Sequence, residues 1–134
     1  MKNILLIFLS LLAITTVGFT ENITLDNQTS YPIKDQKSKI AVQWANSAKD
    51  IDEGNKAIMH GEKLNSGSLQ ILTNQGKIEL KIPKKAEYFR VLVWSKGEGD
   101  PDFHTNWVDV IPGKAYTLQT DHLVPSVLMP GMGC

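Results

Sequence analysis

The 134-residue chain carries 14 basic and 14 acidic residues, three histidines and one cysteine. This even balance argues against a nucleic-acid partner, which would select a basic surface, and a single cysteine cannot form an internal disulfide. The length predicts one domain, large enough to bury a hydrophobic core without covalent cross-links.

The first 18 residues predict a secretory signal peptide. Lys2 precedes an apolar run over residues 4–14 (ILLIFLSLLAI), and small residues then allow cleavage after Gly18, or after Thr20 at the latest. The run is shorter than the roughly 20 residues of a membrane-spanning helix, which disfavours an uncleaved anchor. We therefore expect a bacterial, secreted or periplasmic protein with one domain over residues 19–134 and no stable membrane anchor after cleavage.

The first half of the mature chain has strand patterns. Residues 23–25 (ITL) predict an edge strand, and residues 39–45 (KIAVQWA) place Ile40, Val42 and Trp44 on one face. Residues 69–72 and 77–82 (LQIL and KIELKI) predict two further strands, joined as a hairpin by the loop over 73–76. No window has the apolar period of a helix, so we expect none.

The second half continues in the same way. Residues 88–94 (YFRVLVW) are apolar on both faces apart from Arg90, which predicts a central strand. Residues 105–111 and 115–120 predict strands on either side of a Pro112-Gly113 turn. Residues 123–129 predict an edge strand interrupted by Pro125. Seven or eight short strands favour an all-β fold, namely a single small antiparallel β-sandwich.

One segment sharpens the architecture. Residues 110–118 (VIPGKAYTL) resemble the segment that enters the penultimate strand of fibronectin type III-like domains. The resemblance covers nine residues and implies an immunoglobulin/fibronectin III-like Greek key. It also implies that Tyr116 packs at a corner between the sheets, with its hydroxyl bonded to the backbone. Such sandwiches mostly serve as binding or adhesion modules, so a functional conclusion needs a site as well.

The aromatic residues suggest one contact patch. Trp44 and Trp94 lie in apolar alternation, so we expect both in the core. Trp107 shares its strand register with a charge, Asp109, and follows Phe103 and His104 closely. Phe103, His104 and Trp107 are therefore our candidates for contact with a partner protein or a small ligand, because aromatic residues dominate such contacts. The alternative is that Phe103 and Trp107 serve core packing.

The C-terminal tail offers a different chemistry. Met129, Met132 and Cys134, with His122 nearby, are soft ligands of the kind that bind Cu(I). A lone thiol in an oxidising compartment could instead form an intermolecular disulfide through Cys134, or be incidental to a frayed tail. These residues define the alternative function, a periplasmic copper or thiol-redox protein.

Catalysis and bound cofactors have weaker support. The loop over residues 96–104 carries three carboxylates, which could hold Ca²⁺, but Asp-Pro and glycine also form ordinary solvated loops. The histidines belong to no nucleophile or metal motif. We therefore expect no enzyme activity and no cofactor. The leading interpretation is a non-enzymatic binding or protein-interaction module.

Overall fold

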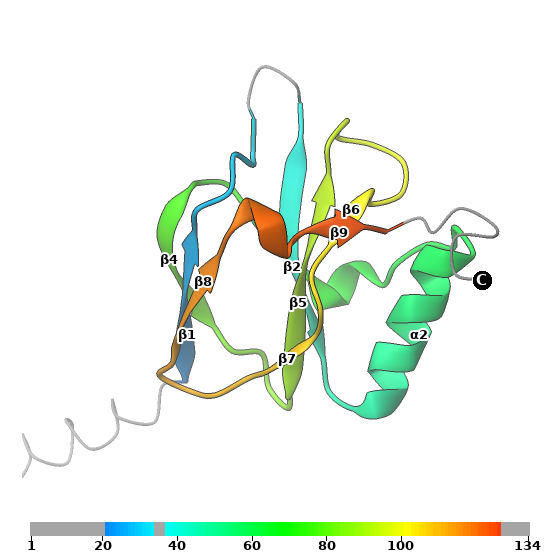
Figure 1. The fold of residues 1–134 in the computed structure, drawn as a ribbon. Coiled ribbons are helices and arrows are strands. Elements are labelled where there is room, and N and C mark those ends of the chain that lie inside the picture. Colours follow the sequence, from blue (N-terminus) through cyan, green and yellow to red (C-terminus); the bar gives the residue numbers. More distant parts are fainter. Residues whose placement is uncertain (1–20, 34–36, 127–134) are drawn as a thin grey trace, which may run out of the picture.

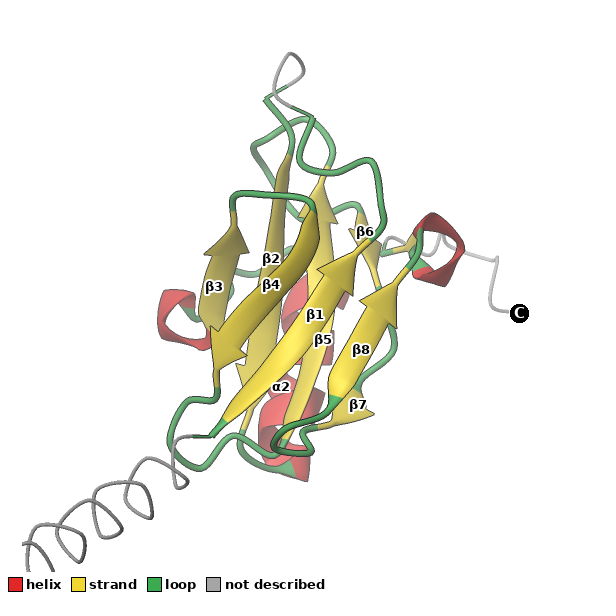
Figure 2. Ribbon diagram, turned by 90° about the vertical axis from the view of Figure 1, so that its left-hand side faces the viewer, coloured by secondary structure: helices red, strands yellow, loops and turns green. Residues whose placement is uncertain are grey.

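Two β-sheets and one α-helix form the described part of the chain, residues 21–33 and 37–126, in a computed structural model (Figures 1 and 2). The elements in chain order are β1 (Asn22–Asn27), β2 (Lys39–Ala45), α2 (Ala48–Met59), the 3-10 helix η2 (Ser66–Ser68), β3 (Leu69–Leu72), β4 (Gly76–Lys81), β5 (Tyr88–Trp94), β6 (Phe103–His104), β7 (Val108–Asp109), β8 (Ala115–Leu118), the 3-10 helix η3 (Thr120–His122) and β9 (Val124–Pro125). The fold is mostly β, as predicted. The predicted leader and residues 127–134 lie outside the described residues.

The strands divide into a small and a large sheet. The three-stranded sheet has the order β4-β1-β8, and the six-stranded sheet has the order β3-β2-β5-β6-β9, with β7 also paired to β5. The pairs are antiparallel except β1 with β8, which is parallel. The prediction of an edge strand over residues 23–25 is wrong, because β4 and β8 pair with the two sides of β1. Side-chain alternation reports which face of a strand is buried and carries no information about its edges.

The apolar core lies between the two sheets. It combines side chains from both of them: Ile23, Leu25, Ile40, Val42, Trp44, Leu72, Leu80, Ile82, Phe89, Val91, Val93 and Leu118. The predicted strands over 39–45 and 88–94 are confirmed, and β5 is central, with β2 on one side and β6 and β7 on the other. The predicted alternation over 77–82 is also confirmed, since Leu80 and Ile82 are buried while Lys77, Glu79 and Lys81 are exposed.

The predicted hairpin between residues 69–72 and 77–82 is wrong. Both strands form, but β3 pairs with β2 in the large sheet and β4 pairs with β1 in the small sheet. The connecting loop therefore crosses from one sheet to the other. The residues of a loop predict that the chain turns there. They do not determine which strands pair, because a four-residue loop can also connect two strands of different sheets.

The helix α2 was not expected, and it forms a third layer on the outer face of the large sheet (Figure 1). It begins at the N-cap Ser47, whose hydroxyl accepts the backbone N–H of Asp50 at 3.3 Å. Its buried residues are Gly54, Ala57 and Ile58, so only one of them is large and apolar. Small residues allow close packing but give a weak hydrophobic period, which is why the sequence concealed the helix. No helix within residues 21–33 and 37–126 is long and apolar enough to cross a membrane.

The predicted strand over residues 105–111 forms only in part. Two short strands, β6 and β7, pair with β5 on either side of residues 105–107, so the described chain has nine strands and not seven or eight. At the break, the hydroxyl of Thr105 accepts the backbone N–H of Val91 at 2.9 Å, in place of a backbone carbonyl. The edge strand predicted over 123–129 is present as β9, which pairs with β6, and its remainder lies outside the described residues.

The corner predicted at Tyr116 is confirmed. Its hydroxyl donates to the backbone carbonyl of Asp109 at 2.6 Å and accepts the backbone N–H of Ile111 at 3.0 Å. The Tyr116 ring meets Phe89 of the opposite sheet edge-on, with 4.9 Å between the ring centroids. The predicted Pro112-Gly113 turn is also present, since Lys114 N–H bonds to the carbonyl of Ile111 at 3.0 Å and Gly113 has φ +80°.

Candidate functional site

Two clefts lie on the two sides of the break at residues 105–107. The inter-sheet cleft, of about 460 Å³, is lined mainly by Phe89, Val91, Val108, Tyr116, Leu118 and His122. The helix-side cleft, of about 480 Å³, is lined mainly by Ile58, Met59, Arg90, His104, Trp107 and Ser126. Thr105, Asn106 and Val124 border both clefts. The broken sheet edge therefore opens both faces of the large sheet.

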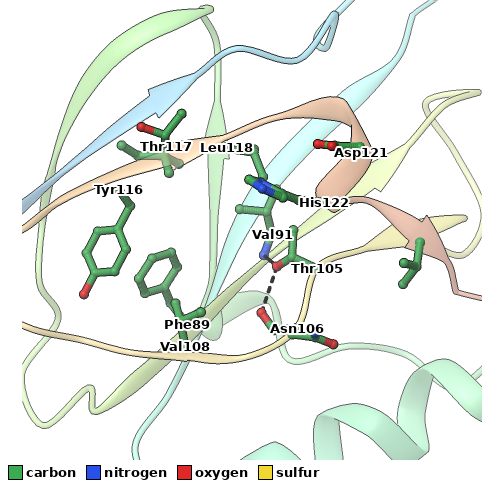
Figure 3. Close-up of a pocket in the computed structure, with 12 residues that line it drawn as sticks. Phe89, Val91, Thr105, Asn106, Val108, Tyr116, Thr117, Leu118, Asp121 and His122 are labelled. Atoms are coloured by element: carbon green, nitrogen blue, oxygen red, sulfur yellow. Dashed lines mark hydrogen bonds between the residues drawn. The ribbon is translucent and has the colours of Figure 1, made fainter.

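The inter-sheet cleft is a lateral opening into the apolar core (Figure 3). The rings of Phe89 and Tyr116 lie side by side at one end, and His122 lies above Val91 at the other. Two of its polar groups are already engaged with the chain: the Thr105 hydroxyl accepts the backbone N–H of Val91, and Nδ1 of His122 accepts the backbone N–H of Gln119 at 3.0 Å. This cleft therefore offers mainly apolar surface.

A buried arginine forms the floor of the helix-side cleft. Arg90 is only 2% exposed; its Nε donates to Oε1 of Gln43 at 2.7 Å and its Nη1 donates to Oδ1 of Asn55 at 2.9 Å. Its Nη2 has no hydrogen-bond partner within the described residues. Burial lowers the pKa of Arg90 to about 10, so the guanidinium stays charged at neutral pH. No carboxylate of the described chain forms an ion pair with Arg90. The ion pair found within the described residues joins Lys56 and Asp52 at the surface.

Trp107 covers this guanidinium. The centre of the Arg90 guanidinium lies 4.4 Å from the centroid of the Trp107 ring, a cation–π contact. The indole Nε1 donates to Oδ1 of Asn55 at 3.0 Å, so one amide oxygen accepts from both Trp107 and Arg90. Trp44 and Trp94 are each 6% exposed and belong to the buried clusters, as predicted. Trp107 is only half-buried, which leaves part of its surface open to the cleft.

Gly54 brings α2 close to this group. A Cβ placed at Gly54 would lie 3.4 Å from Nη2 of Arg90, from Nε2 of Gln43 and from the Trp107 ring. The helix backbone therefore lies so close to this group that even a methyl group at position 54 would be in van der Waals contact with it. The helix thus removes Arg90 from bulk solvent, while the cleft remains beside it.

His104 and Ser126 form the other wall of the helix-side cleft. His104 pairs in register with Leu92, which faces the helix, and its Nδ1 lies 2.9 Å from the hydroxyl of Ser126. Burial lowers the pKa of His104, and the positive charge of Arg90 lowers it further. His104 is therefore neutral at neutral pH and can accept or donate one hydrogen bond at each nitrogen according to its tautomer.

The structure divides the predicted contact patch. His104 and Trp107 line the helix-side cleft together, whereas Phe103 pairs with Val93 and packs against the core between the sheets. Two of the three predicted contact residues therefore share a cleft.

Of the predicted metal or thiol residues, the structure describes only His122, so the predicted cluster stays a prediction. His122 lines the inter-sheet cleft, and Met129, Met132 and Cys134 lie outside the described residues. Within the described ranges, no three His, Cys, Asp or Glu side chains cluster as a metal site would require. Asp102, from the acidic loop, accepts hydrogen bonds from the backbone N–H and the hydroxyl of Ser95.

Arg90, Asn55 and Ser126 line the helix-side cleft although the sequence did not predict them as site residues. A signal existed for Arg90, since it is the one charge in a strand predicted to be buried on both faces. A charge in such a position needs compensation by a partner. Nothing in the sequence distinguished Asn55 or Ser126.

Comparison with known proteins gives no matching family model and no similar curated protein. The function is therefore inferred from the two clefts and from the chemistry of the residues that line them.

Proposed function

We propose that this chain is an exported bacterial binding module without enzymatic activity, built as a small sandwich of the immunoglobulin/fibronectin III-like type. The sandwich type is supported by the core shared between two sheets and by the Tyr116 corner. Export is supported by the composition of residues 1–18.

The ligand site in this proposal is the helix-side cleft. One observation carries it: the half-exposed Trp107 stacks on a buried guanidinium at the edge of a cleft that also has an apolar wall, formed by Ile58, Met59, Val124 and Pro125. Ligand sites commonly combine apolar and aromatic walls with a few fixed polar groups. Here the polar groups are Arg90, His104 and Ser126, all held by hydrogen bonds or packing to strands or to α2.

The inter-sheet cleft is the weaker candidate because its chemistry is less specific. The Thr105 hydroxyl and Nδ1 of His122 already accept backbone N–H groups, and the apolar walls of this cleft are mostly side chains of the core. Binding there would compete with the packing that holds the two sheets together.

The test is an NMR titration of the secreted chain labelled with ¹⁵N at tryptophan, using a fragment library of acids, amides, amines and sugars. Ligands of the helix-side cleft should shift the indole N–H signal of Trp107 and leave that of the buried Trp44 unchanged. Trp107→Phe should weaken these ligands by about tenfold, followed through the ring protons of His104.

A library in which no compound shifts the Trp107 signal would contradict the proposed site, as would compounds that act only on Tyr116 and His122. The intact mass of the protein exported by a bacterial host tests the other half of the proposal. The mature chain should begin at residue 19 or residue 21, and a retained leader would contradict export.

A further inference from the structure

We propose that the helix-side cleft binds a carboxylate that carries an apolar group. This inference rests on the proposed function, since it names the ligand class of the same cleft. The carboxylate is recognised by Arg90 with Ser126 and His104, and the apolar group lies along Trp107 and the exposed end of α2.

The first argument is an uncompensated charge. A guanidinium has five N–H donors, and two of those in Arg90 are used within the described chain, one by Gln43 and one by Asn55. Both partners are neutral amides, so they satisfy hydrogen bonds without cancelling the charge. Burial of a cation without a counter-charge is costly, and an anionic ligand would remove that cost.

The second argument is the set of donors in the cleft. The unpartnered Nη2 of Arg90 is buried beside Gly54 and under the Trp107 ring, so a carboxylate reaches it when that ring turns aside. Hydrogen bonds between a guanidinium and a carboxylate are stronger than neutral ones. The Ser126 hydroxyl and His104 ring lie in the same cleft and hold each other at 2.9 Å. Either group can donate to a carboxylate oxygen, and neither carries a negative charge that would repel it.

The third argument concerns the apolar walls. Met59 and Val124 are 72% and 44% exposed, and both line this cleft with Ile58 and Pro125. An inorganic anion on Arg90 would leave these side chains in water. A ligand with an apolar group next to its carboxylate would cover them, at a gain of about 25 cal/mol per Å² buried.

The experiment compares ligands of matched shape on the full secreted chain. We expect 3-phenylpropionate to bind at least about tenfold more tightly than 3-phenylpropanamide, because the two differ in the charge that Arg90 would meet. Inorganic phosphate should bind more weakly than the acid. N-acetylphenylalanine, compared with its amide, distinguishes the C-terminal carboxylate of a peptide from a free acid as the source of the group.

A single substitution can place a negative charge of the protein itself next to Arg90. Asn55→Asp preserves the oxygen that accepts from Arg90 and Trp107 but makes it a carboxylate. We expect it to weaken 3-phenylpropionate by about tenfold or more and to leave the amide unaffected. The control is Asn65→Asp, which adds the same charge at the exposed N-cap of η2, where the oxygen accepts Gly67 N–H.

The outcomes separate this inference from the proposed function. Equal affinity for acid and amide, or an Asn55→Asp variant that binds the acid unchanged, would overturn the carboxylate while the cleft remained a binding site. Phosphate binding as tightly as the acid would overturn the apolar group. A chain that binds no compound at Trp107 would overturn the proposed function itself.

Discussion

On one face of β5, Phe89, Val91 and Val93 enter the apolar core between the sheets, whereas Arg90 lies on the other face beneath α2. Strand β2 repeats the division, since Val42 faces the core and Gln43 holds the arginine. The same two central strands therefore bury an apolar surface between the sheets, whereas their helix-side face combines an apolar cluster of Ala41, Leu92 and Trp94 with the polar network around Arg90.

The difference teaches where stability and recognition reside in this chain. The inter-sheet face is mostly filled by packed apolar side chains, and each of them contributes through the area it removes from water. The helix face contains a charge that nothing in the described chain neutralises. Such a group contributes little to stability on its own, which makes it a candidate for a role in binding.

The largest effect should come from the apolar face. Phe89→Ala should lower the free energy of unfolding by about 3–5 kcal/mol, because Phe89 contacts Trp44 and also Tyr116 of the opposite sheet. Urea unfolding followed by circular dichroism measures it. A loss below about 1 kcal/mol would show that the packing of the two sheets does not depend on this contact, and would contradict the assignment of stability to the inter-sheet face.

The matched change on the polar face should be far smaller. Arg90→Met keeps the length of the side chain and removes the buried charge, at the expense of a donor to Gln43. We expect the free energy of unfolding to stay within about 1 kcal/mol of the parent value, because relief of desolvation offsets the lost hydrogen bonds. Carboxylate binding should disappear in the same variant. A loss of about 3 kcal/mol or more in the same urea experiment would assign Arg90 a structural role.

The apolar face was largely predictable from the sequence, and the helix was not. Alternation over residues 39–45, 77–82 and 88–94 records which side chains share a face, and the Pro112-Gly113 turn with Tyr116 records a corner. The helix escaped because Gly54 stands where a helix normally shows a large apolar residue. The pairing of the strands could not be predicted because strands pair with segments far away in the sequence.

The site was predictable only in part, for a reason visible at the break in the sheet edge. In an unbroken strand, Phe103 and Trp107 would lie on one face, because side chains alternate with a period of two. The regular ladder breaks after Thr105, whose N–H still bonds to the carbonyl of Val91 at 2.9 Å. Strand β7 therefore begins with the opposite alternation, and Val108 takes the core side opposite Phe89. Trp107 thereby joins His104 on the helix side. No local pattern in the sequence announces this change of face.

The smallest expected effect is on the pH dependence of stability, through the influence of Arg90 on His104. Burial and then Arg90 lower the pKa of His104 below its usual 6.5 in the folded chain, whereas the unfolded chain keeps the usual value. Between the two values the unfolded chain binds more protons, so stability rises with pH there. The contribution of His104 is fully present above about pH 6.5 and is lost as the pH falls through the folded-state pKa.

The contribution of His104 to the pH dependence of stability can be measured by comparing the parent chain with variants that keep His60 and His122. Urea unfolding from about pH 8 to about pH 5 should show a smaller loss of stability in His104→Gln than in the parent chain. In Arg90→Met, NMR titration of the His104 ring should give a higher pKa than in the parent, because the charge that opposes protonation is gone. Identical His104 titrations in the two chains would mean that the arginine does not act on this side of the cleft, and that the polar face consists of two independent groups.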